Sequence, residues 1–201
     1  MTGRALAAWL LLGASVGLLG CGGPRPYGAM ARAARSQESL ASRLEDRAMK
    51  AEILANLMED GALGGARVTP YVYMGHAFLV GSVRTPAQRD AAIADARRVT
   101  GVRSVEAYLP QTRGRRSASR TAADVRLKSQ LERRLSLDAA LTHIDLAVID
   151  GHAVLLGVVP SQEAVQLAGT TAQGTSGIAG VTNFLLVPEE GYERRRPGPG
   201  G

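Results

Sequence analysis

The stretch Val148-Ile-Asp-Gly-His-Ala-Val-Leu-Leu-Gly-Val158 decides how this chain folds. Apolar residues, many of them β-branched, fill most of positions 144–149 and 153–159 on either side of Asp150-Gly151. Because Asp-Gly adopts the positive φ angles that a tight hairpin turn needs, the stretch predicts two antiparallel strands.

Two helices and a third strand are predicted around this hairpin. Upstream, Thr121 and Asp124 have the spacing of a helix N-cap with a carboxylate three residues later. Downstream, Pro160-Ser161 begins a second helix, residues 177–181 end it, and residues 181–187 form the last strand. The upstream helix carries an apolar stripe at helical spacing, at Ala123, Leu127, Leu131 and Leu135.

The same order recurs earlier in the chain, so the sequence contains a tandem repeat of one small module. A shift of 76 residues places Gly75-His76 on Gly151-His152 and Gly81 on Gly157 without a gap. In the helix before the hairpin the shift is 78 residues, and it places Met49, Ile53 and Leu57 on Leu127, Leu131 and Leu135.

The repeated motifs resemble a BON domain. In the second copy they are Asp124-Val-Arg-Leu-Lys-Ser-Gln-Leu131, the hairpin stretch and Gly177-Ile-Ala-Gly-Val-Thr-Asn183; the first copy has Ala77-Phe-Leu-Val-Gly-Ser-Val83 and Gly101-Val-Arg-Ser-Val105. The resemblance implies an α+β fold of two tandem αββαβ modules, each a three-stranded mixed sheet with both helices on one face. It also implies attachment to phospholipid surfaces in the bacterial envelope, without catalytic residues.

Length and composition limit the alternatives. Modules of about 65 residues bury only roughly 60% of the surface that their unfolded chains expose, so we expect the two modules to pack on each other. The formal net charge is +6, and almost every basic residue is an arginine. With two Phe and one Trp, the 201-residue chain offers few platforms for stacking on bases, and a nucleic-acid partner is not expected.

Residues 1–20 are typical of a lipoprotein signal peptide. Arg4 supplies a positive start, and the apolar residues 5–19 are too short to span a membrane. The motif Leu18, Leu19, Gly20 and Cys21 resembles a lipobox, which implies that the Cys21 thiol receives diacylglycerol. The alternative is an ordinary signal peptide with a chance cysteine.

Acylation of Cys21 would anchor the mature protein to a membrane. Each buried methylene contributes about 0.8 kcal/mol, so two or three acyl chains hold a protein where one does not. By resemblance to Gram-negative lipoproteins, Gly22 after the cysteine implies the periplasmic face of the outer membrane.

The predicted domains follow the repeat. Residues 21–45 form a lipidated N-terminus with a tether at 22–35 and a helical extension. Module one then occupies residues 46–110 and module two residues 121–188. Between them lies an Arg-rich linker at 111–120, which either contacts anionic headgroups or is simply solvated. Residues 189–201 are expected to be disordered.

No group of residues predicts an enzyme. His76 and His152 occupy equivalent places in two hairpin turns, which favours a repeated turn residue. His143 has no nearby partner in the sequence, and the five-residue spacing of Asp145 and Asp150 puts them on opposite faces of a strand. No His and Cys cluster has metal-ligand spacing, so neither a metal nor a cofactor is expected.

Two features are candidates for special roles. Gly81 and Gly157 lie inside strands, where glycine marks a bulge or a close approach by another backbone, and we expect a helix packed tightly across the sheet. Arg126 and Arg133 share one face of the helix that begins module two. By resemblance to phospholipid-binding BON lipoproteins, the headgroup contacts are expected at Arg126, Lys128 and Arg133, although exposed basic residues are often only solvated.

The sequence therefore predicts a non-enzymatic outer-membrane lipoprotein that binds anionic phospholipid and supports outer-membrane integrity. The alternative is a scaffold, anchored by its lipid, that docks envelope proteins on exposed sheet faces or edges.

Overall fold

The computed structural model describes residues 26–112, 114 and 117–188. By its contacts the chain divides into two units between Ser36 and Gln37. Both modules belong to the second unit.

Module one is built on a three-stranded sheet in the order β1-β2-β3. Strands β1 (Arg67–Tyr73) and β2 (His76–Ser82) are antiparallel, whereas β3 (Ser104–Tyr108) runs parallel to β2. Helix α1 (Pro26–Glu59) and the short 3-10 helix η1 (Gly61–Leu63) precede the hairpin. Helix α2 (Pro86–Arg97) makes the crossover that the parallel pair requires.

Module two repeats this arrangement. Strands β4 (Asp145–Ile149) and β5 (His152–Val158) are antiparallel, and β6 (Gly180–Leu186) is parallel to β5. Helix α3 (Ala118–Leu135) with η2 (Ala139–Leu141) comes before the hairpin, and α4 (Gln162–Gln173) is the crossover. Two αββαβ modules with mixed sheets confirm the predicted fold class.

The hairpins and helix starts follow from local chemistry. The turn residues Asp150 and Gly151 have φ angles of 49° and 78°, as the Asp-Gly pair predicts. In module one the turn is Met74-Gly75, with φ angles of 55° and 76°. Thr85 caps α2, where its side chain accepts from the Gln88 N–H, and Pro86 follows at the first helical position.

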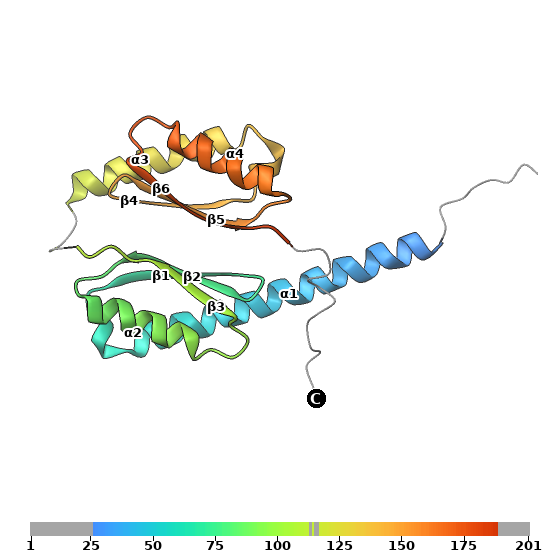
Figure 1. Cartoon of the computed structure of the whole chain (residues 1–201). Coiled ribbons are helices and arrows are strands. Elements are labelled where there is room, and N and C mark those ends of the chain that lie inside the picture. Colours follow the sequence, from blue (N-terminus) through green and yellow to red (C-terminus); the bar gives the residue numbers. More distant parts are fainter. Residues whose placement is uncertain (1–25, 113, 115–116, 189–201) are drawn as a thin grey trace, which may run out of the picture. The chain divides into compact units, whose positions relative to one another are not determined.

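Each module has its own core between helices and sheet. Figure 1 shows both helices of a module on the same face of its sheet. Ile53 of α1 and Leu131 of α3, equivalent in the repeat, are each 0% exposed. The core of module one also contains Leu79 and Ala92, and that of module two contains Leu155 and Ala168.

The other faces of the two sheets meet each other. Phe78 and Val80 of β2 and Val154 and Leu156 of β5 are buried in one shared apolar cluster. The rings of Phe78 and Phe184 lie 5.2 Å apart, centroid to centroid. Strands β2 and β5 are thus covered on both faces, which explains why their sequences are continuous apolar runs instead of alternating ones. The expectation that the modules pack on each other is confirmed.

Several local predictions were wrong. Helix α1 begins at Pro26, so residues 26–35, predicted as part of a tether, are helical. This stretch is rich in alanine, the strongest helix former, which outweighed its single glycine, Gly28. Helix α3 is capped by Ser117 through the Arg120 N–H, before the predicted cap Thr121. His76 and His152 are the first residues of β2 and β5, after the turns instead of within them.

The reason given for the strand glycines was also wrong. A Cβ at Gly81 would lie 1.8 Å from the Arg67 carbonyl oxygen, and one at Gly157 would lie 3.2 Å from that of His143. The close neighbour is therefore the chain at the start of the adjacent strand, not a helix across the sheet.

Candidate functional site

The outer face of α3 carries the arginines that the sequence singled out. Arg126 and Arg133 are exposed, while Leu131 and Leu135 on the other side of the helix are buried. Their seven-residue spacing is close to two full turns, so the two guanidinium groups share one face. Within the described residues, neither arginine forms an ion pair.

Lys128 does not join this pair. It lies two residues from Arg126, about 200° around the helix, and its ammonium is paired with the Glu132 carboxylate one turn later. Of the three predicted headgroup contacts, the structure brings together Arg126 and Arg133 and leaves Lys128 on another flank.

Helix α3 is held in place by a side chain whose role the sequence did not show. The Asp124 carboxylate accepts hydrogen bonds from the Asp150 N–H at 3.0 Å and the Gly151 N–H at 2.9 Å. Asp46 does the same in module one, with the Met74 and Gly75 N–H groups at 2.8 and 2.9 Å. The aspartates align in the repeat at the 78-residue shift, which is the signal that would have revealed them.

Two surface cavities lie near these elements. One, of about 280 Å³, is between α3 and its hairpin and is lined by Arg120, Ala123, Asp124, Leu127, Asp150 and Gly151. Another, of about 310 Å³, is in module one and is lined by Gly65, Ala66, Arg67, Ser82, Arg84, Thr112 and Gly114. The sequence predicted neither of them.

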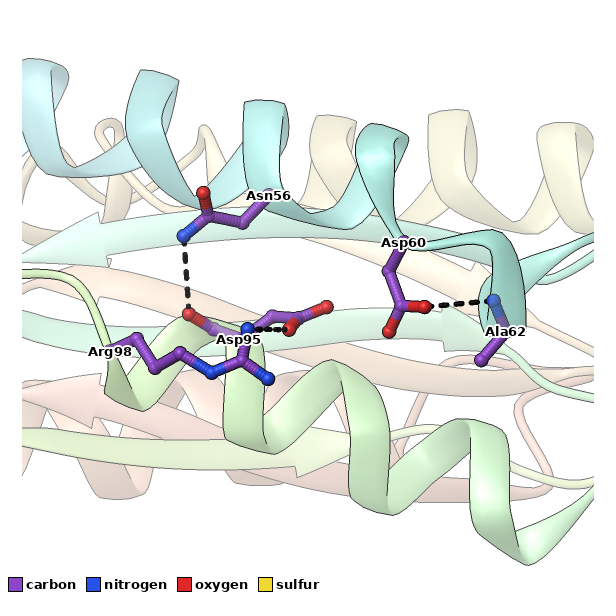
Figure 2. A network of polar contacts seen from close by, with 5 residues as sticks. All are labelled: Asn56, Asp60, Ala62, Asp95 and Arg98. Atoms are coloured by element: carbon purple, nitrogen blue, oxygen red, sulfur yellow. Dashed lines mark hydrogen bonds and ion pairs between the residues drawn. The ribbon is translucent and has the colours of Figure 1, made fainter.

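Asp95 of α2 is the most deeply buried carboxylate of the described residues, at 1% exposure. Figure 2 shows it beside Arg98, with 3.0 Å between the charged atoms, and near Asp60, which caps η1 through the Ala62 N–H. Burial raises the pKa of Asp95, and Arg98 only partly opposes this. A raised pKa is common in catalytic acids, but Asp95 lines neither cavity named above.

His76 and His152 line neither of the two cavities. His76 is hydrogen-bonded to Ser104 at 2.7 Å, and His152 to Thr182 at 2.8 Å. The His152 ring also stacks on Tyr108 of the other module, 4.4 Å between centroids, and burial lowers its pKa. Residues 26–112, 114 and 117–188 contain no cluster of His, Cys, Asp and Glu that would hold a metal ion.

The predicted lipobox, Leu18 to Cys21, lies outside the described residues. In the part that the structure describes, no helix has the length and apolar character to cross a membrane.

Comparison with known proteins agrees with this architecture. The family model of the BON domain matches residues 45–109 and 121–189, two thirds of the chain. The chain belongs to the BON family. BON domains bind phospholipid or mediate association with the bacterial envelope, and the family is non-catalytic.

Among solved structures, the chain is similar to CdsD, a structural protein of the Type III secretion system of Chlamydia trachomatis. The similarity covers 73% of this chain and 98% of that one, with 16% identity and a TM-score of 0.32. The C-terminal domain of CdsD matches with 13% identity and a TM-score of 0.31, covering 69% of this chain and 96% of that one. No curated protein matched the sequence.

Proposed function

We propose that this chain is a non-enzymatic lipoprotein of the outer membrane, facing the periplasm, that binds anionic phospholipid and supports membrane integrity. The headgroup contact is the outer face of α3. The observation that carries the proposal is the exposed pair Arg126 and Arg133 on a helix fixed to its hairpin by Asp124.

Electrostatics give the expected strength of this contact. A basic residue near an anionic membrane surface contributes about 1 kcal/mol. Two arginines therefore give a weak site, and a lipid anchor at Cys21 keeps that site at a high local concentration of headgroups.

Vesicle flotation of the full chain with Cys21→Ser tests the proposal without the acyl anchor. We expect preferential binding to anionic over neutral vesicles, and a loss of about 2 kcal/mol or more, on the order of 30-fold in affinity, in Arg126→Glu/Arg133→Glu. The matched control is Arg89→Glu/Arg97→Glu, which makes the same charge change at two exposed positions of α2. Equal binding to both vesicle types, or equal loss in both variants, would contradict the proposal.

The rival function, a scaffold that docks partners on sheet faces, has less support. Phe78, Val154 and their neighbours bury those faces against each other within the chain. In the part of the chain that the structure describes, this leaves sheet edges and helix surfaces for a protein partner.

A further inference from the structure

Helix α1 has two apolar faces, and the fold of module one uses only one of them. Met49, Ile53 and Leu57 are buried in the module core. On the opposite side, the side chains are apolar and exposed: Leu40 56%, Leu44 63%, Leu54 41% and Met58 78%. We call this opposite side the outer seam of α1; it also includes the exposed residues Ala48, Ala51 and Ala55.

The outer seam has the spacing of a coiled coil. Positions 44, 48, 51, 55 and 58 alternate steps of four and three residues, and all of them are apolar, while Arg47 and Glu52 flank this stripe. A repeat of 3.5 residues keeps such a stripe facing one partner helix along its length. At 1.5 Å per residue the seam is roughly 27 Å long.

The equivalent helix of module two lacks this seam. At the 78-residue shift, Ala51, Leu54 and Met58 become Ser129, Glu132 and Ser136. Because α3 folds onto its sheet with Ser129, Glu132 and Ser136 at these positions, the fold of a module does not require apolar residues there. The seam on α1 therefore needs another explanation.

Charges of opposite sign border the seam. Arg43, Arg47 and Lys50 lie along one side, and Glu45, Glu52 and Glu59 lie along the other. In two parallel copies related by a two-fold axis, the basic side of each helix meets the acidic side of the other. In an antiparallel pair, like charges would meet, which is destabilising.

We infer that the outer seam of α1 binds the same seam of a second copy of this chain, with the two helices parallel. Arg47 lies at the basic side of the seam, five residues before Glu52, which is the separation at which flanking charges pair between parallel coiled-coil helices. The pairing places the N-terminal ends of the two α1 helices at the same end of the dimer.

A membrane surface is the other apolar environment that such a seam could enter. Helices that lie in the headgroup region have lysine and arginine on their polar face. Here one entire side is acidic, so Glu52 and Glu59 would be brought against anionic headgroups. The charge pattern thus favours a second copy.

A seam of this length gives weak pairing in dilute solution, because short helix pairs bury little surface. Chains held on one membrane meet at a much higher effective concentration. Only this strengthening rests on the proposed lipid anchor; the pairing itself does not depend on phospholipid binding by α3.

Cysteine cross-linking of the full chain in its membrane tests the inference. In a parallel pair in register, residue 51 of one copy faces residue 51 of the other, so Ala51→Cys should form a disulfide-linked dimer under mild oxidant. Ser129→Cys, at the equivalent position of α3, should give at least about tenfold less dimer at the same effective concentration. The parent chain controls for any cross-linking through Cys21.

A charge reversal tests the parallel arrangement. Added to Ala51→Cys, Arg47→Glu should lower the cross-linked fraction several-fold, and a further Glu52→Arg should restore it. Both positions are exposed, so the fold is retained, which circular dichroism checks. Cross-linking should persist in Arg126→Glu/Arg133→Glu, which separates this result from the vesicle test.

The inference is overturned if Ala51→Cys and Ser129→Cys cross-link equally, or if Arg47→Glu has no effect. It is also overturned if Ala51→Cys does not cross-link while Leu44→Ser/Met58→Ser weakens vesicle binding. That result would place the seam in the membrane.

Discussion

Helices α1 and α3 are alike where they face their sheets and different where they face away. Ile53 and Leu131 are fully buried at equivalent positions, and Asp46 and Asp124 hold equivalent hairpin turns. On the outside, α1 is apolar at Leu54 where α3 has Glu132. The inner positions are constrained by packing in both modules. The outer ones are free to diverge, so the two modules differ most at their outer faces.

The largest expected effect comes from the strand glycines. Gly81→Leu places a side chain against the Arg67 carbonyl, 1.8 Å from the new Cβ, and Gly157→Leu forces a side chain onto a φ of 131°. Strain and overpacking together should cost about 4 kcal/mol or more in each module. Urea unfolding followed by circular dichroism measures the cost.

Gly169→Ala is the matched control for these substitutions. Gly169 lies within α4, and a Cβ there meets nothing closer than 3.5 Å, so alanine should stabilise the helix by up to about 1 kcal/mol. If Gly157→Leu were as stable as the parent, the close approach of the His143 carbonyl would not be what requires glycine.

The next effect tests whether the two cores are equivalent. Ile53→Ala and Leu131→Ala each leave a cavity at a position with 0% exposure, and each should cost about 3 kcal/mol. The measurement is the free energy of unfolding in urea. Costs that differ several-fold would show that the aligned positions are packed differently in the two modules.

A smaller loss is expected from the turn aspartates. Asp46→Ala and Asp124→Ala each leave two turn N–H groups without their carboxylate, at a cost of about 2 kcal/mol. Asp90→Ala, at an exposed position of α2, is the control and should change little. Thermal unfolding would contradict this account if the control were as damaging as the aspartates.

The smallest effects are pH dependences of opposite sign. Burial raises the pKa of Asp95 in module one, so the folded chain binds that proton more tightly than the unfolded chain does. Stability from this site therefore falls as pH rises above the ordinary carboxyl pKa of 3.8. Burial lowers the pKa of His152 in module two, so stability from that site falls as pH drops below the ordinary value of 6.5.

Urea midpoints measured between about pH 4 and 8 separate the two contributions. Asp95→Asn should raise the free energy of unfolding at neutral pH. It should also remove the increase in stability that the parent shows as the pH is lowered toward 4. His152→Gln should remove the decrease in stability that the parent shows below the ordinary imidazole pKa. If neither substitution changed the pH profile, other groups would be responsible for it.

Much of the fold was predictable because its signals are local. The Asp150-Gly151 turn, the caps at Thr85 and Ser161 and the apolar helix stripes all lie within a few residues of what they determine. The exposed pair Arg126 and Arg133 followed from helical periodicity alone. Long-range contacts were missed: Asp124 was interpreted as a helix-capping residue because its partners at the turn are 26 and 27 residues away.

Contacts between the modules were also beyond sequence patterns. Tyr73 of β1 donates a hydrogen bond to Asp145 of β4, and Tyr108 stacks on His152. No periodicity relates these residues, because each pair joins strands of different modules. The same packing covers the sheet faces that the sequence left available for partners.

The sequence by itself determined the order of helices and strands, their repetition and the inner face of each helix, because turn chemistry and periodicity act on neighbouring residues. The tertiary structure alone decided which apolar surfaces are covered, because burial depends on residues far apart in the chain. It buries Phe78 against the second module and leaves Leu44 and Met58 exposed, although all three are apolar. The outer seam of α1 is a candidate interface only because the fold does not cover it.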